Sequence, residues 1–186
     1  MILIGIVGTF GAGKGTLTEY LVRKYSFTHF SVSEFLADEA ERRGLGRDRQ
    51  ARADIANSFR AEGPTKLMEA VYEEALKSGA DRVIIDPQHT KREVEFIKEK
   101  GGIIIAVDAD LPIRYERIQK RGSPKDQVTY EEFVEHQMRE MANPDPNKNN
   151  LADAIEAADY CFLNNGTLEA FEKDIEKTLG ALFNRE

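Results

Sequence analysis

Five short apolar runs alternate along the chain with longer stretches in which apolar residues recur at helical spacing. The runs are rich in β-branched or aromatic residues and are bounded by polar ones, which is typical of parallel strands covered on both faces. They lie at 2–7, 28–32, 83–85, 103–107 and 160–163. Helical spacing covers residues 14–25, 34–43, 50–60, 65–78, 91–100, 111–121, 129–140 and 168–184. The alternation predicts an α/β fold, a three-layer α/β/α sandwich with right-handed crossovers.

The carboxyl ends of the predicted strands indicate where a ligand binds. In parallel α/β sheets, ligands lie outside the carboxyl edge. The residues near these ends are Val7, Ser31, Asp86, Asp108 and Leu163. We therefore expect the residues just after them to converge on one site. Two polar segments interrupt the pattern, residues 44–50 and residues 142–150, and the prolines and asparagines of the second disfavour a helix.

The first apolar run leads directly into a glycine-rich segment with the pattern of a phosphate-binding loop. Residues 8–16 read Gly-Thr-Phe-Gly-Ala-Gly-Lys-Gly-Thr. Glycines let such a loop curl with its N–H groups pointing inward, the next helix adds positive charge, and Lys14 can reach the β- and γ-phosphates. A chance glycine-rich turn is the alternative, and the flanking strand and helix disfavour it. The prediction is ATP binding by Gly11, Ala12, Gly13, Lys14, Gly15 and Thr16.

One position in this loop departs from the usual pattern, in which Ser or Thr directly follows the lysine and binds Mg²⁺. Gly15 takes that place, and Thr16 supplies the hydroxyl one residue later. Asp86 ends the third apolar run, where a carboxylate can orient hydrated Mg²⁺. The alternative is that Asp86 caps the next helix, which begins near Thr90. We expect Thr16, and Asp86 through water, to serve a bound Mg²⁺.

Composition narrows the class of protein. A chain of 186 residues suffices for one domain. A net charge of −7 argues against broad binding to nucleic acid or to an anionic membrane. Cys161, the only cysteine, lies in an apolar run and is expected in the core, and it allows neither an internal disulfide nor a zinc site. We see no signal peptide or membrane span and expect a cytoplasmic protein, monomeric or dimeric.

Arginines form two groups along the chain. Arg114, Arg117 and Arg121 share one face of a predicted helix that follows a strand ending at the site. Several guanidinium groups suit a phosphoryl group in transfer, and we expect Arg117 and Arg121 to stabilise it. The alternative is a solvated face paired with acidic residues. The second group, in a stretch that also contains Asn57, is Arg42, Arg43, Arg47, Arg49, Arg52 and Arg60.

Together these segments resemble the nucleoside monophosphate kinase superfamily over nearly the whole chain. The Gly-Lys-Gly-Thr loop ending and the block Glu116-Arg117-Ile118 to Arg121 look like those of adenylate kinases. The stretch from Arg49 to Pro64 is similar to a deoxynucleotide-kinase acceptor helix. The segment 164–168 is similar to the adenine-side segment of these kinases. The deoxynucleotide-kinase and dephospho-coenzyme A kinase-like branches are the most similar.

The resemblance implies a P-loop NTP hydrolase fold with a five-stranded parallel sheet in the order 2-3-1-4-5. It implies adenine contacts at Asn165 and Gly166, and an acceptor-binding insertion at about 33–64. The implied acceptor residues are Ser33, Arg42, Arg49, Asn57, Arg60, His89 and Arg139. One departure matters, because these families carry an arginine soon after the strand-3 aspartate. Here the sequence is Asp86-Pro87-Gln88-His89, so His89 or Arg92 would have to hold the acceptor.

The leading hypothesis for function is Mg²⁺-dependent transfer of the ATP γ-phosphoryl group to a small nucleotide, most simply a (deoxy)nucleoside monophosphate. One alternative is a dephospho-coenzyme A kinase. Another is a nucleotide-binding regulatory or assembly ATPase that has no small-molecule acceptor, which the missing arginine favours.

A kinase must exclude water from the phosphates, so we expect a segment that closes over them. The candidate lid is 122–150, with Gly122-Ser123-Pro124 as a hinge, a loop around Pro144 and Pro146, and Arg139 pointing back to the site. The alternative is a rigid surface hairpin in which Arg139 pairs with a neighbouring glutamate.

Overall fold

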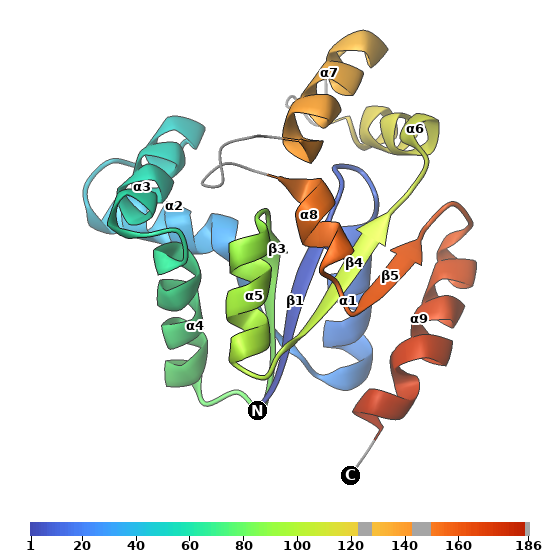
Figure 1. Cartoon of the computed structure of the whole chain (residues 1–186), viewed down its shortest axis with the longest axis horizontal. Coiled ribbons are helices and arrows are strands. Elements are labelled where there is room, and N and C mark those ends of the chain that lie inside the picture. Colours follow the sequence, from blue (N-terminus) through green and yellow to red (C-terminus); the bar gives the residue numbers. More distant parts are fainter. Residues whose placement is uncertain (123–127, 143–149, 185–186) are drawn as a thin grey trace.

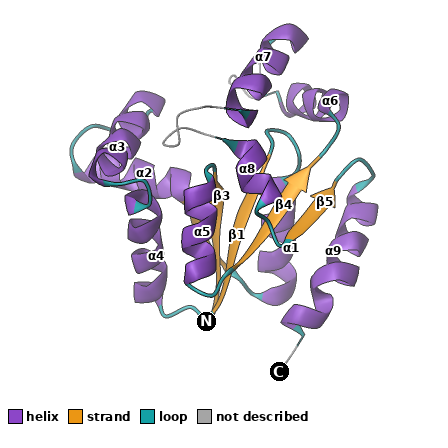
Figure 2. Ribbon diagram, in the orientation of Figure 1, coloured by secondary structure: helices purple, strands orange, loops and turns teal. Residues whose placement is uncertain are grey.

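The computed structural model describes residues 1–122, 128–142 and 150–184. Five strands form one parallel sheet between helices (Figures 1 and 2). The strands are β1 (Ile2–Gly8), β2 (Thr28–Ser31), β3 (Arg82–Gln88), β4 (Ile103–Asp108) and β5 (Tyr160–Leu163). They lie in the order β2-β3-β1-β4-β5. The three-layer α/β/α fold and the strand order 2-3-1-4-5 are therefore confirmed.

The helices follow the expected spacing closely. They are α1 (Lys14–Tyr25), α2 (Val32–Arg42), α3 (Arg49–Glu62), α4 (Lys66–Ser78), α5 (Lys91–Glu99), α6 (Leu111–Arg121), α7 (Tyr130–Met141), α8 (Leu151–Glu156) and α9 (Leu168–Phe183). The short helix α8 was not expected. The Asn150 side chain accepts a hydrogen bond from the Asp153 amide and starts α8, but six residues are too few to show a helical period in the sequence.

Alternate residues of the central strand face two separate apolar cores. Leu3 and Val7 of β1 pack with α4, α5 and α8, while Ile4 and Ile6 pack with α1 and α9 on the other face. All four side chains are at most 3% exposed. A strand buried on both faces needs apolar residues at every position, which is why β1 is a continuous apolar run.

Helices α2 and α3 form a third, smaller cluster beside the sheet. Ala40 of α2 meets Ala51 and Ile55 of α3, and Leu36 and Phe59 pack against them. Figure 1 shows this pair at the β2 edge of the molecule, above α4. It occupies the segment 33–64 in which the sequence predicted an acceptor-binding insertion.

All five strands end at the edge of the sheet that lies below α6 and α7 (Figure 1). Ser31 is paired with Asp86 across β2 and β3, and Asp108 is paired with Leu163 across β4 and β5. The expected convergence of strand ends is confirmed. The N-terminus and the end of α9 lie at the opposite side of the molecule (Figure 1).

Two further sequence expectations concern single features. Cys161 is exposed, so its expected place in the core is wrong. It lies on β5, an edge strand whose one buried residue is Phe162, and a short apolar run does not reveal that its strand is at the edge. Among the described helices, none is both long and apolar enough to cross a membrane.

Candidate active site

The loop after β1 has a backbone shape that requires glycine. Gly8, Gly11 and Gly13 have φ angles of 151°, 82° and 110°. A Cβ atom on Gly8 would lie 2.1 Å from the Val107 carbonyl oxygen, and one on Gly13 would lie 2.5 Å from Asn164 Nδ2. The loop therefore combines a left-handed backbone with close packing, and only glycine satisfies both conditions. Helix α1 begins directly after it without a side-chain cap, which leaves its first N–H groups for an anion.

Lys14 lies inside this loop. Its Nζ donates to the carbonyl oxygens of Gly8, at 2.8 Å, and Thr9, at 3.0 Å. Burial lowers the pKa of Lys14 to about 8, although the carboxylates of Asp86 and Glu140 act in the opposite direction. Negative charge beside a buried ammonium raises its pKa, so the position favours a bound polyphosphate.

Two joined hollows extend from the loop along α1 and α6. The first, of about 600 Å³, is lined by Phe10, Gly11, Gly13, Lys14, Gly15, Thr16, Glu19, Arg117, Ile118 and Arg121. The second, of about 250 Å³, is lined by Gly13, Thr16, Arg117, Asn164, Gly166, Leu168 and Phe171. Because they share Gly13, Thr16 and Arg117, the two hollows adjoin each other beside the loop.

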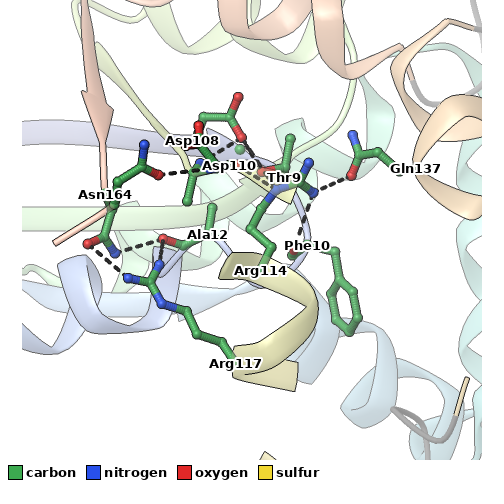
Figure 3. Close-up of polar contacts among 12 residues, drawn as sticks. Thr9, Phe10, Ala12, Asp108, Asp110, Arg114, Arg117, Gln137 and Asn164 are labelled. Atoms are coloured by element: carbon green, nitrogen blue, oxygen red, sulfur yellow. Dashed lines mark hydrogen bonds and ion pairs between the residues drawn. The ribbon is translucent and has the colours of Figure 1, made fainter. Parts of the chain in front are cut away.

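Asn164 ties the end of β5 to the phosphate loop (Figure 3). Its Nδ2 donates to the Ala12 carbonyl at 2.8 Å, and Arg117 donates to its Oδ1 at 3.4 Å. Arg117 also donates to the carbonyls of Ala12 and Gly166, each at 3.4 Å. Asn165 Oδ1 accepts from the Asp110 amide at 2.8 Å. Gly166 thus lines the second hollow, whereas the Asn165 side chain contacts the residue before α6. Asn164, which carries more of the contacts, was not singled out, although its place after β5 could have indicated it.

Arg114 is a buried link between the loop and α7 (Figure 3). Its Nε donates to the Ala109 carbonyl at 2.7 Å, and its Nη1 donates to the Phe10 carbonyl at 3.3 Å and to Gln137 Oε1 at 2.5 Å. Burial lowers its pKa. Arg114 therefore positions Phe10 and α7. Sequence spacing alone could not separate this role from those of its neighbours on α6.

The other two arginines of α6 point to different parts of the site. Arg117 lies at the Asn164 end of the joined hollows. The Arg121 guanidinium lies 5.2 Å from the centre of the Phe10 ring and lines the hollow that contains Lys14. The structure thus brings both arginines beside the phosphate loop, with Arg121 next to Phe10.

Thr16 lines the hollow that contains Lys14, and Asp86 lies near the same lysine. Asp86 is close enough to Lys14 for their charges to interact, and its Oδ1 also contacts His29 Nε2. Thr90, not Asp86, caps α5, so the capping alternative is not what the structure shows. No group of three or more His, Cys, Asp or Glu side chains suited to a metal occurs among the described residues. Mg²⁺ in phosphate sites takes few protein ligands, so one hydroxyl and one carboxylate fit it.

Most of the acceptor-side arginines are engaged with neighbours. Arg42 and Arg43 pair with Glu39, and Arg47 pairs with Glu34, Asp38 and Glu41. Arg52 donates to Ser33 Oγ at 3.1 Å, and Arg60 donates to Asn57 Oδ1 at 3.4 Å. Arg49, at the start of α3, instead lines a third hollow beside the phosphate loop. Arg49 thus lies beside Phe10 of the loop, and the charge of Arg60 acts on His89.

His89, rather than Arg92, lies toward the phosphate loop. Arg92 lines a groove between α4 and α5 on the outside of the domain. Burial lowers the pKa of His89 to about 4, and the nearby charges of Lys14 and Arg60 act in the same direction. Its Nδ1 is buried without a hydrogen-bond partner among the described residues. His89 is thus a neutral imidazole at pH 7.

The third hollow, of about 240 Å³, separates α3 from α7. Its lining consists of Phe10, Arg49, Val128, Phe133, His136, Gln137 and Glu140. Arg139 lies outside it and pairs with Glu135 at 3.1 Å, both side chains being about 70% exposed. This is the arrangement of the alternative to an inward-pointing Arg139. Two parts of the expected lid lie outside the described residues. They are Ser123-Pro124 of the hinge and the loop around Pro144 and Pro146.

The strand order, the glycine loop closed around Lys14 and the joined hollows define a P-loop protein of the kinase type. A sequence model described as an AAA domain matches residues 7–134. The UPF0200 protein PAE1629 of Pyrobaculum aerophilum is 31% identical over 182 residues, covering 95% of this chain and 96% of its own. A UPF0200 protein of Hyperthermus butylicus is 28% identical over 183 residues, covering 97% and 95%. The chain therefore belongs to this AAA-domain family and to the UPF0200 proteins.

Solved structures share the fold over the whole length. A shikimate kinase from Bacteroides thetaiotaomicron superposes with a TM-score of 0.64 at 16% identity, covering 96% of this chain and 98% of that one. TT1252 from Thermus thermophilus gives a TM-score of 0.61 at 22% identity, covering 97% of each chain. These similarities show that the chain shares the fold of these proteins.

Proposed function

We propose that this protein transfers the γ-phosphoryl group of ATP, with Mg²⁺, to a small nucleotide acceptor. The observation that carries the proposal is Lys14, an enclosed ammonium at an uncapped helix start, beside adjoining hollows of about 600 and 250 Å³. One arginine-lined hollow lies beside the phosphate loop and another lies across it. A P-loop protein of the kinase type with both hollows has room for a donor and an acceptor.

The chain's residues would bind and orient the donor. The N–H groups of 11–16 would surround the β-phosphate, and Lys14 would bind the β- and γ-phosphates. Arg117, held by Asn164 and Gly166, would lie at the nucleoside end, and Arg121 would stabilise charge on the transferring group. Thr16 and, through water, Asp86 would hold Mg²⁺, which neutralises charge on the phosphate oxygens.

Two acceptor classes compete for the remaining hollow. The family resemblance implies a (deoxy)nucleoside monophosphate, with Arg49 in position to bind an anionic group. The neutral His89 favours dephospho-coenzyme A, whose reacting group is a hydroxyl, because an uncharged imidazole does not neutralise an acceptor phosphate.

A coupled assay of ADP release, run with each nucleoside monophosphate and with dephospho-coenzyme A, tests the proposal directly. We expect at least one acceptor to accelerate ADP release well above the basal rate. Lys14→Met should lower acceptor-dependent turnover by about 10³-fold or more, since it removes a charge that acts on the transferring group. Lys173→Met, an exposed change on α9, is the control.

Two results would contradict the proposal. Near-normal turnover by Lys14→Met would remove the assigned role of the loop lysine. Slow ATP hydrolysis that no acceptor stimulates would instead favour a regulatory or assembly ATPase.

A further inference from the structure

Glu140 on α7 is an acidic residue that faces the hollow across the phosphate loop. It lines this hollow together with Phe10 of the loop and Arg49 of α3. Its side chain is half-buried, whereas Glu135 on the same helix is an exposed partner of Arg139. Gln137, one turn earlier on α7, lines the same hollow and is tied through Arg114 to the Phe10 carbonyl. The part of α7 that carries Glu140 is thus linked to the phosphate loop.

The charges around Glu140 come from several elements. Lys14 in the loop, Arg114 on α6 and His136 on α7 all favour the carboxylate, and Arg49 of α3 lines the same hollow. Burial is nevertheless the largest influence and raises the pKa of Glu140. A carboxylate whose pKa is raised is a stronger base than one in water, so it accepts a proton more readily from a reacting group.

On the opposite side of the loop, His89 rather than an arginine comes soon after Asp86, and Arg60 of α3 lies close enough to His89 for its charge to act on the imidazole. His89 is neutral, and Arg92 is on the outer surface of α5. A carboxylate near the transfer position repels an acceptor phosphate, but it attracts the proton of a hydroxyl. Arg49 could bind an anionic group of the acceptor that lies away from the reacting hydroxyl. Glu140 on one side of Lys14 and the neutral His89 on the other therefore both favour an acceptor that reacts through a hydroxyl group.

We propose that the group phosphorylated at this site is a hydroxyl of the acceptor and that Glu140 receives its proton. This inference rests on the phosphoryl transfer proposed above and specifies its acceptor. The hydroxyl oxygen forms a bond to the γ-phosphorus of ATP. The bond from that phosphorus to the β,γ-bridging oxygen breaks, with its electron pair leaving on ADP. The hydroxyl proton goes to the Glu140 carboxylate, and the product is a phosphate monoester.

The test combines product analysis with a Glu140→Gln variant of the full chain. The probes are AMP, CMP, their deoxy forms, adenosine and dephospho-coenzyme A, each supplied with ATP and Mg²⁺. Phosphorus NMR distinguishes the products, because a phosphate monoester gives an uncoupled signal and a new phosphoanhydride gives a coupled pair. We expect a monoester. Glu140→Gln should lower kcat by about 10²-fold or more with little change in the KM for ATP, as expected for loss of a proton acceptor.

The pH profile separates a proton acceptor from a merely structural residue. The wild-type kcat should fall at acidic pH as Glu140 becomes protonated, and the Glu140→Gln variant should lack this acidic limb. Glu131→Gln, an exposed change in the first turn of α7, is the matched control and should keep the wild-type kcat and profile.

Three results would overturn the proposal. A phosphoanhydride product, with Glu140→Gln close to full activity, would refute the hydroxyl acceptor but leave ATP-dependent phosphoryl transfer intact. A monoester product with an unchanged acidic limb in Glu140→Gln would refute the role of Glu140 alone. Absence of any acceptor-dependent ADP release would refute the proposed function, and this inference with it.

Discussion

Asn164 offers the sharpest test of how the phosphate loop is held. Its side chain is 7% exposed and joins the Ala12 carbonyl to Arg117. Asn164→Ala removes the 2.8 Å hydrogen bond to Ala12 and the longer one from Arg117 at 3.4 Å. The Ala12 carbonyl then keeps only the 3.4 Å contact with Arg117. We expect the phosphate loop and the nucleoside end of the site to be held less firmly in place.

The magnitude follows from burial. Leaving a buried acceptor poorly satisfied costs about 1–3 kcal/mol. In a chain of this size, each kcal/mol shifts Tm by about 2–4 °C, so Tm should fall by roughly 2–12 °C. Asn165→Ala is the matched control. It removes a hydrogen bond at an exposed position, between Asn165 Oδ1 and the Asp110 amide, and should cost well under 1 kcal/mol.

The assay is urea unfolding followed by circular dichroism, together with ATP titration of the same samples. Asn164→Ala should unfold at lower urea with an unchanged slope and should bind ATP more weakly than Asn165→Ala. If the two variants had equal unfolding free energies within about 0.5 kcal/mol, the link from Asn164 to Ala12 would not contribute to stability as argued.

Further predictions concern the glycine loop and pH. Gly15→Ala should raise the free energy of unfolding by about 0.4–1 kcal/mol, because no atom lies within 4 Å of the added Cβ and the residue is helical. Gly13→Ala should instead be destabilising, since its Cβ would lie 2.5 Å from Asn164 Nδ2 at a φ of +110°; equal thermal melts for the two variants would contradict this. Below pH 6.5, His89 becomes protonated in the unfolded chain. In the folded chain it stays neutral, because the pKa of His89 there is about 4. Stability should therefore fall by about 1 kcal/mol between pH 7.5 and 5.5, and by less in His89→Gln, as urea unfolding at both pH values can show.

The local pattern was enough to predict the framework of the fold. Buried parallel strands are continuous apolar runs, and the glycine loop with Lys14 follows one of them, so strand, loop and helix were each predicted in place. The strand order came from the family resemblance, because strand positions alone do not state which strands are neighbours.

The directions of single side chains could not be predicted in the same way. Arg114, Arg117 and Arg121 share one helix face, yet Arg114 is buried under α7 while the other two line the hollows. Cys161 lies in an apolar run but on an edge strand, where it is exposed.

The sequence by itself determined the elements and the phosphate loop, because periodicity and glycine geometry act between residues that are near in the chain. The tertiary structure alone decided that His89 and not Arg92 faces the loop, and that Glu140 approaches it from α7. These placements depend on how helices pack on a sheet formed from distant segments. Burial and neighbouring charges, which set the pKa values of His89 and Glu140, exist only after that packing.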